Sequence, residues 1–428
     1  MEYRRLGRTE KQVSLLGIGG GYVMLLDIEA GTGIYQRAAE LGVNYFDGRY
    51  GYTSTMQRPV IKQDREHFIV ATKTASNTRD AALRRIDEDL AELETDYLDI
   101  FYLRAYNQEM IDAHFAPGGS VEGLLEARDQ GKIHALGLAG HSDLSALARG
   151  VDTGLVDVVE FPLNVVRRDA FDDLIPACLR EDVGMVIMKP VNVGLVPAEV
   201  ALTWLANQPI HVMAPGISTM EQLEIDVAAL DRDPMALTPE EAAVAEHWRQ
   251  KMDTETCRIC DKVCQAVCEQ HLIIDWQIYH NVFQNELRRL GVEGFLEYPF
   301  APWVRENAER TFSNTLAEIQ ACTQCGKCEE VCPHHLPIMD ILERIKEEQA
   351  SLLEALRTGP YGRCVYACDN DVVDHQVVNF QFQGGRTGAF TMTAFTEYRH
   401  RQTRIFGTRG ELTGDGEKVQ IYDFLTEK

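Results

Sequence analysis

The chain has 428 residues, with 42 basic and 66 acidic side chains and a formal net charge of −24. Nucleic-acid binding is disfavoured because a phosphate backbone needs a basic surface, and no apolar run approaches the roughly eighteen residues of a membrane span. Since no basic-then-apolar signal opens the chain, we expect a cytoplasmic protein. The length predicts two or three domains.

The first part of the chain, residues 1–245, alternates apolar strand-like runs with amphipathic helical stretches, in pairs. The runs are continuous, as expected of parallel strands buried on both faces. The number of pairs predicts an α/β fold, a (β/α)8 TIM barrel, with an open doubly wound sheet as the alternative. That alternative lacks its full glycine fingerprint, since Tyr22 stands where a third glycine should follow Gly17 and Gly19. The expected strands are Ser14–Gly20, Asn44–Asp47, Phe68–Lys73, Tyr97–Leu103, Ile133–Gly140, Val156–Asn164, Val183–Pro190 and Ile210–Ile217.

Polar residues stand at the ends of these predicted strands, where barrel enzymes carry their chemistry. Asp47 and Lys73 each end a strand, and Tyr50 and Tyr52 follow Asp47. A lysine–aspartate pair beside a tyrosine lowers the tyrosine pKa and suits proton donation. An ordinary ion pair across the barrel mouth is the alternative.

Ordered motifs along residues 1–245 resemble the aldo-keto reductase family. They are YRRLGRT at Tyr3–Thr9, NYFD at Asn44–Asp47, ATK at Ala71–Lys73 and PGIS at Pro215–Ser218. The resemblance implies that a tyrosine protonates a substrate carbonyl while NAD(P)H delivers hydride, with lysine and aspartate tuning the tyrosine. Asp47 and Lys73 match directly; Tyr50 is the preferred proton donor, and Tyr52 is the alternative.

Two departures from the family pattern bear on chemistry and cofactor choice. Arg104 stands where the family has histidine, and it is expected to bind an anionic group or the developing oxyanion. Gly216 and Gln222 replace the basic residues that grip the 2′-phosphate of NADP(H), which favours NAD(H). His141 is an expected substrate contact, with a structural role as the alternative, and Arg49 is expected either to contact an acidic substrate or to pair with Asp47.

The predicted cofactor site lies around the last strand. Gly216, Ile217, Ser218 and Thr219 lead into a helix, where backbone N–H groups and the helix dipole suit a pyrophosphate. The resemblance adds Asn164, Lys189 and Gln222 as cofactor contacts.

Two cysteine runs follow in residues 251–357. The second run has the C-x2-C-x2-C-x3-C-P spacing of a 4Fe-4S loop, whereas zinc sites usually take two separated pairs of ligands. In two-cluster ferredoxins the last cysteine of each run ligates the other cluster. Cys268 would therefore bind the cluster held by the first three cysteines of the second run, and Cys332 would bind the cluster held by the first three cysteines of the first run. The two runs are Cys257, Cys260, Cys264 and Cys268, then Cys322, Cys325, Cys328 and Cys332.

This segment resembles bacterial-type ferredoxin domains with two clusters and a long insertion between the runs. We expect the insertion's aromatic residues to pack around the clusters, and Pro337–Leu356 to form a helix that packs this domain on the barrel. A structural remnant or a disulfide-bonded loop is the alternative for the first run.

The tail, residues 361–428, alternates in period two with glycine turns, which predicts an antiparallel β segment. It resembles the end of the C-terminal domain in Gfo/Idh/MocA sugar dehydrogenases. Unpaired strand edges favour a homo-oligomer or another partner surface.

Together these patterns predict an aldo-keto reductase-type oxidoreductase acting on a small carbonyl or alcohol, sugar-like by association with the tail. The two clusters would serve electron transfer, with a ferredoxin or flavoprotein as partner, or structure. The alternatives are an iron–sulfur electron-transfer or assembly protein with a catalytically degenerate barrel, and a lyase or isomerase that uses the same tyrosine–lysine pair.

Overall fold

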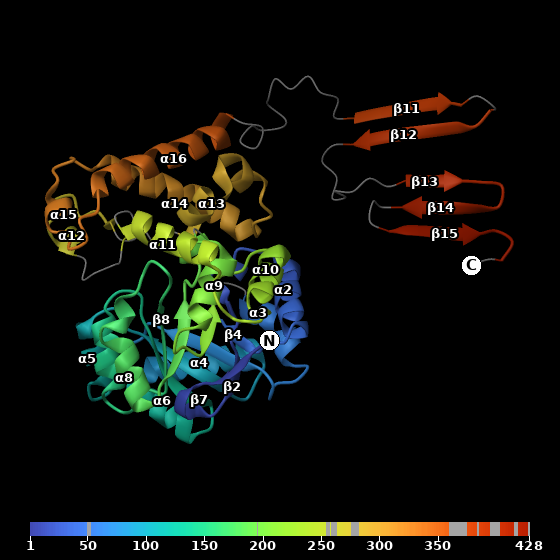
Figure 1. Ribbon diagram of the computed structural model, residues 1–428. Coiled ribbons are helices and arrows are strands. Elements are labelled where there is room, and N and C mark those ends of the chain that lie inside the picture. Colours follow the sequence, from blue (N-terminus) through green and yellow to red (C-terminus); the bar gives the residue numbers. More distant parts are fainter. Residues whose placement is uncertain are drawn as a thin grey trace. The chain divides into compact units, whose positions relative to one another are not determined.

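The computed structural model shows two compact units, Met1–Gly362 and Arg363–Lys428 (Figure 1). It describes residues 1–48, 53–194, 196–253, 257, 263–274, 282–358, 375–382, 385–393, 403–414 and 418–426. Within these residues, no helix combines the length and the apolar composition needed to cross a membrane.

The first unit is built on eight parallel strands that pair in chain order, β3 through β10. The ring closes where Gly19 N–H donates to Pro215 O at 2.9 Å and Met213 N–H donates to Leu15 O at 2.8 Å. The (β/α)8 barrel prediction is therefore confirmed. The strands are β3 (Gly17–Gly19), β4 (Tyr45–Asp47), β5 (Ile69–Thr74), β6 (Leu98–Arg104), β7 (Ile133–Ala139), β8 (Val158–Pro162), β9 (Gly184–Met188) and β10 (Val212–Ala214).

Helices follow each strand and cover the outside of the ring, where the largest apolar core lies between strands and helices. They are α1 (Gly20–Val23), α2 (Ile28–Glu40), α3 (Thr53–Ile61), α4 (Arg79–Leu93), α5 (Gln108–Phe115), α6 (Ser120–Asp129), α7 (Leu144–Val151), α8 (Leu174–Glu181), α9 (Ala198–Ala206), α10 (Met220–Ala229) and α11 (Pro239–Asp253). Three short 3-10 turns, Gly7–Thr9, Asp169–Phe171 and Asn192–Gly194, complete this part.

A second core fills the inside of the barrel. Alternate strand residues point inward, and Tyr45, Ile100 and Tyr102 meet Leu6 and Val13 there. Leu6 and Val13 belong to an N-terminal hairpin, β1 (Tyr3–Arg5) with β2 (Gln12–Ser14), which the sequence analysis did not anticipate. Because this core fills the end of the barrel away from the strands' carboxyl ends, any ligand must enter from the opposite end.

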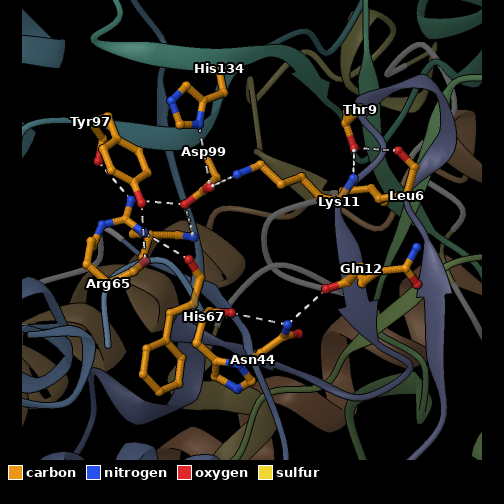
Figure 2. Close-up of polar contacts among 12 residues, drawn as sticks. Leu6, Thr9, Lys11, Gln12, Asn44, Arg65, His67, Tyr97, Asp99 and His134 are labelled. Carbon is orange, nitrogen blue, oxygen red and sulfur yellow. Dashed lines mark hydrogen bonds and ion pairs between the residues drawn. The ribbon is translucent and has the colours of Figure 1, made fainter. Parts of the chain in front are cut away.

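A polar network braces the same closed end (Figure 2). The buried carboxylate of Asp99 on β6 accepts from Val70 N–H at 3.0 Å and pairs with Arg65 and Lys11, each at 2.9 Å. Burial opposes ionisation, but His134 and these cations hold the pKa of Asp99 below its usual value. Since Asp99 is the second residue of β6, the network in Figure 2 braces the amino ends of the barrel strands.

A helical region follows the barrel, with α13, α14 and α16 stacked as a layer over it (Figure 1). Its helices are α12 (Val263–Ala266), α13 (Val282–Glu297), α14 (Pro302–Gln320), α15 (Lys327–Glu330) and α16 (Ile338–Thr358). The expected terminal helix is thus present as α16, which packs on α13, α14 and α15. Its Leu352 and Leu353 belong to the same apolar core as Leu25 of the barrel.

The insertion's aromatic residues differ from expectation in what they touch. Phe295, Phe300 and Phe312 form a core with Leu25 of the barrel, separate from the cysteine-bearing core. Ala301 N–H also donates to Leu25 O at 2.8 Å. The insertion therefore binds the helical layer to the barrel, and Trp276 and Tyr279 lie outside the described residues.

The second unit has two antiparallel sheets, which confirms the period-two pattern of the tail. Its resemblance to the Gfo/Idh/MocA domain, the proposed domain boundaries and a homo-oligomeric state stay predictions. The strands are β11 (His375–Gln381), β12 (Thr387–Thr393), β13 (Thr403–Phe406), β14 (Gly410–Gly414) and β15 (Val419–Asp423).

Candidate functional site

A cavity of about 670 Å3 opens at the carboxyl ends of the barrel strands. Its lining includes residues from seven of the strands and from the loops that follow them, together with Arg289 from α13 of the helical region. The predicted residues that line it are Asp47, Lys73, Arg104, His141, Lys189, Gly216 and Gln222. The structure thus brings together residues from distant parts of the sequence.

A buried cluster of three charges lies in this cavity. Lys73 Nζ donates to Asp47 Oδ2 at 2.9 Å and to Glu160 Oε2 at 2.6 Å. The three side chains are at most 5% exposed. Strand alternation explains the meeting, because Asp47, Lys73 and Glu160 each follow an inward-pointing residue by two positions.

Glu160 was missed by the sequence analysis. It sits in the apolar run VVEFP of β8, two residues after the inward-facing Val158. A lone carboxylate in a strand buried on both faces must meet a cation or take up a proton. Applied to the residues of β8 that alternate toward the inside of the barrel, this rule is the signal that could have identified Glu160.

The charge balance of the cluster bears on its chemistry. Burial raises the pKa of Asp47, the Glu160 carboxylate raises it further, and Lys73 and Arg104 oppose the rise. Asp47 Oδ1 is buried and has no hydrogen-bond partner among the described residues. Asp47 therefore retains an unused acceptor, or a proton site, facing the cavity.

Arg104 and His141 stand at the cavity wall, as expected of residues that follow strands. The ring of His141 stacks on Tyr106 with centroids 6.1 Å apart. Both Arg104 and His141 line the same cavity as Lys73. Their placement is compatible with contacts to a substrate, and their roles stay proposals.

Asn164 differs from the other predicted cofactor contacts, because the cavity lining does not include it. Its Oδ1 accepts from the N–H groups of Val166 and Arg167 at 2.9 and 2.8 Å, and its Nδ2 donates to Lys189 O at 3.1 Å. In this structure Asn164 shapes the loop after β8 and positions Lys189.

Lys189 itself is half-buried at the cavity wall. Burial lowers its pKa to about 7, Arg167 lowers it further, and the thiol of Cys257 acts in the opposite direction. The first cysteine of the cluster region thus lies within electrostatic reach of a residue that lines the barrel cavity.

The turn after β10 leads into the N-terminus of α10, which a side chain caps. Thr219 caps α10 by accepting from Gln222 N–H at 3.1 Å, and Gln222 Oε1 accepts from Ser218 N–H at 2.9 Å. Gly216 has no room for a side chain, because an added Cβ would lie 2.3 Å from the ring of Tyr22. Ile217, Ser218 and Thr219 shape this turn, whereas Gly216 and Gln222 line the cavity.

The predicted proton donors fall outside the described residues. Arg49, Tyr50 and Tyr52 lie between Gly48 and α3, in the stretch that the structure does not describe. The choice between Tyr50 and Tyr52, and the substrate contact of Arg49, therefore stay predictions.

The cysteine region supports the crossover predicted for a two-cluster ferredoxin. Cys268 lines one small cavity together with Cys322, Cys325 and Cys328. Gly326 adopts a left-handed conformation, with φ of 76°, in the turn before α15. The cysteine from the first run thus lies beside three cysteines of the second run.

The remaining cysteines pack nearby. Cys257 and Cys264 contact the apolar core that contains Cys332, and Cys260 lies outside the described residues. No disulfide joins one described cysteine to another, which does not support a disulfide-bonded loop among them. Burial raises the pKa of Cys328 to about 11, so a thiolate there needs a positive partner such as iron. Among described residues, no three His, Cys, Asp or Glu side chains converge on a single-ion site.

Comparisons with known proteins agree with both halves of this arrangement. Residues 27–197 match the aldo/keto reductase family, and residues 256–337 match a 4Fe-4S dicluster domain. Uncharacterized oxidoreductases of Mycobacterium tuberculosis and Mycobacterium bovis are 25% identical over 289 residues, covering 51% of this chain and 85% of theirs.

Among solved structures, the holo form of an aldo-keto reductase from Bacillus halodurans has a TM-score of 0.51 and 21% sequence identity. The match covers 58% of this chain and 96% of that one, and it shows the barrel fold.

Proposed function

Because this oxidoreductase chain carries an aldo/keto reductase domain followed by a 4Fe-4S dicluster domain, we propose that it interconverts a small carbonyl compound and its alcohol with NAD(P)(H). The buried Asp47–Lys73–Glu160 cluster, facing a cavity that the turn before α10 also lines, carries the proposal. It offers a proton-handling group and a cofactor-sized space at one end of a barrel.

The proton would reach the substrate oxygen from Tyr50, with Tyr52 as the alternative donor. The Lys73 ammonium lowers the pKa of a neighbouring phenol, and Asp47 and Glu160 keep that ammonium charged in a buried setting. Arg104 would stabilise negative charge on the substrate oxygen. Nicotinamide, when bound, supplies the hydride that the chain's own side chains cannot.

The cofactor would lie with its diphosphate at the turn before α10. This turn presents N–H groups at a helix N-terminus, and the first turn of α10, MEQ, contains no basic side chain. The missing positive charge supports NAD(H) over NADP(H). Lys189 and Gln222 line the same wall and would contact the cofactor.

The cysteines would hold two 4Fe-4S clusters, one on Cys268, Cys322, Cys325 and Cys328, the other on Cys257, Cys260, Cys264 and Cys332. Such clusters exchange single electrons with a protein partner, a ferredoxin or flavoprotein, or brace the fold. The electrostatic reach between Cys257 and Lys189 supports a cluster position close to the cavity.

A second function has one observation in its favour. Arg104 stays charged and cannot act as a neutral imidazole donor at the cavity wall. An iron–sulfur electron-transfer or assembly protein with a non-catalytic barrel would tolerate that change.

The two functions are separated by turnover of NADH with a panel of small aldehydes, ketones and sugars, measured anaerobically. We expect NADH oxidation with at least one carbonyl, and its loss in Tyr50→Phe with NADH affinity retained. Tyr52→Phe is the matched control; if it alone abolishes turnover, Tyr52 is the donor. Turnover that both variants leave unchanged would contradict the reductase mechanism.

A further inference from the structure

The helical region reaches into the barrel cavity through one side chain. Arg289 on α13 lines the cavity together with Gly216, Gln222 and Tyr22. Its Cδ lies 3.7 Å from the position that a Cβ on Gly194 would occupy. The guanidinium therefore reaches the cavity from the helical layer, on the wall that the turn before α10 helps to form.

Arg289 is held in place before any ligand binds. Its Nε donates to Glu286 Oε2 at 3.0 Å, and Nη2 bonds the same oxygen. The Glu286 side chain is 0% exposed, so this pair has a buried anchor. Such preorganisation reduces the entropy lost when a ligand binds.

Tyr298 ties the same helix to the predicted cofactor turn. Its hydroxyl donates to Ser218 O at 2.7 Å, and the Arg289 guanidinium lies 5.5 Å from its ring centroid. Ser218 is the residue whose N–H and hydroxyl bond Gln222. Arg289, Tyr298 and the turn therefore form one connected support.

Part of the guanidinium remains available for a ligand. The ion pair uses Nε and Nη2, and no hydrogen bond from Nη1 is found among the described residues. Two carboxyl groups, Glu199 and Asp226, also line the cavity, and burial raises the pKa of Asp226 to about 7. Arg289 therefore adds positive charge to a cavity that these two carboxyl groups also line.

We propose that Arg289 binds a phosphate group of the dinucleotide held at residues 216–222, so that the ferredoxin-like region completes the cofactor site of the barrel. The inference rests on the proposed function, since it names a further binding residue for the same cofactor. Arginine suits this role because its planar fork binds phosphate oxygens in pairs.

The geometry also has a consequence for the clusters. α13 lies in the sequence between the two cysteine runs, and α16 packs on both α13 and the cysteine core. Loss of the clusters would loosen the support of Arg289 and thereby weaken nucleotide binding.

The test is the dissociation constant of NADH and NADPH for the full chain, its Arg289→Gln and Arg289→Lys variants, and the control Arg305→Gln. Arg305 is an exposed arginine on the neighbouring helix α14. We expect Arg289→Gln to weaken binding about 10-fold, Arg289→Lys to weaken it less, and Arg305→Gln to leave it unchanged. Circular dichroism and cluster absorbance check that each variant folds, and Arg289→Lys carries the test if Arg289→Gln does not.

The pattern across cofactors identifies the phosphate. Equal loss for NADH and NADPH indicates the diphosphate, and a loss confined to NADPH indicates the 2′-phosphate. Wild-type affinity in both Arg289 variants would overturn this inference and leave the proposed function standing. If the wild-type chain binds neither nucleotide, the proposed function fails together with it.

Discussion

At the residue scale, the central feature is an ammonium group shared by two buried carboxylates. Burying charges is costly unless each is paired, and Lys73 bridges Asp47 and Glu160 within 2.9 Å. The sequence identified Lys73 and Asp47 because both end predicted strands. Glu160 was hidden because its neighbours in β8 are apolar and the strand was expected to run to Asn164.

Replacing Glu160 with glutamine removes the carboxylate that raises the pKa of Asp47. We expect the pKa of Asp47 to fall, so that the infrared band of its protonated carboxyl disappears at lower pH than in the wild type. Glu122→Gln, an exposed change on α6, is the control. An unchanged titration in Glu160→Gln would show that the two carboxylates do not interact.

Replacing Lys73 with methionine leaves two buried carboxylates without their cation. The free energy of unfolding should fall by about 3–5 kcal/mol at neutral pH, and adding Glu160→Gln should recover part of the loss. Chemical denaturation measures both. Lys62→Met, which breaks an exposed pair with Glu94, should cost at most about 1 kcal/mol. Equal losses at Lys73 and Lys62 would contradict the burial argument.

At the element scale, the apolar periodicity predicted all eight barrel strands, and the errors have local physical causes. Val156–Asn164 was too long, because the Asn164 side chain bonds the N–H groups of Val166 and Arg167 and bends the chain. Ser14–Gly20 merged two elements, since β2 ends at Ser14 and β3 begins at Gly17. Apolar periodicity predicts which residues of a segment are buried, but it does not predict which strand a short segment pairs with.

A capping box in the sequence coincides with the start of one helix. The pattern of threonine, proline and two glutamates at residues 238–241 starts α11, where Glu241 N–H donates to Thr238 Oγ1 and Thr238 N–H donates to Glu241 Oε2. By contrast, the partner of the aromatic insertion could not be predicted, because apolar side chains pack equally well on a cysteine core or on a barrel.

The Asp99 brace makes a prediction about acid stability. The native pKa of Asp99 lies below its unfolded value, so its stabilising effect is full above about pH 4 and is lost as the pH falls through the native pKa. Asp99→Asn should therefore lower the free energy of unfolding by roughly 2–4 kcal/mol at neutral pH and by less in acid. Denaturation curves at several pH values measure the difference, and a pH-independent loss would contradict the charge-based explanation.

At the scale of the whole molecule, the chain combines a barrel with a helical region whose Arg289 lines the barrel's own cavity. The sequence predicted the barrel from its apolar runs and the cysteine region from the spacing of its cysteines, since spacing determines which ligands can share a cluster. It could not predict Arg289, because an arginine in an insertion helix carries no local signal of what it faces. Distance in sequence hides such contacts between regions.

The crossed cysteine pairing gives a test of cluster assignment. Cys268 lines the cavity of Cys322, Cys325 and Cys328, so Cys268→Ser and Cys325→Ser should damage the same cluster. We expect the double variant to lose no more iron than either single one, about four of eight atoms. Cys264→Ser combined with Cys325→Ser should lose both clusters. Iron analysis and electron paramagnetic resonance measure the clusters that remain in each variant. If the Cys268→Ser and Cys325→Ser changes together lose the sum of the iron lost by each alone, the crossover is excluded.

The tail leaves many apolar side chains exposed in the part that the structure describes, such as Val377, Ile405, Ile421 and Leu425. Exposed apolar side chains on a sheet favour contact with another protein surface, and a homo-oligomer remains the prediction. The alternating pattern predicted the sheets, whereas the identity of what covers them depends on a partner that sequence periodicity does not encode.

The most direct test of the central claim is an anaerobic titration of the purified chain with NADH and NADPH, following intrinsic fluorescence and iron–sulfur absorbance together. The proposed oxidoreductase predicts saturable binding, tighter for NADH than for NADPH. Bleaching of the clusters on NADH binding would place them in electron transfer with the barrel, and unchanged absorbance would indicate structural or externally reduced clusters. Absence of saturable binding for either nucleotide would contradict the account.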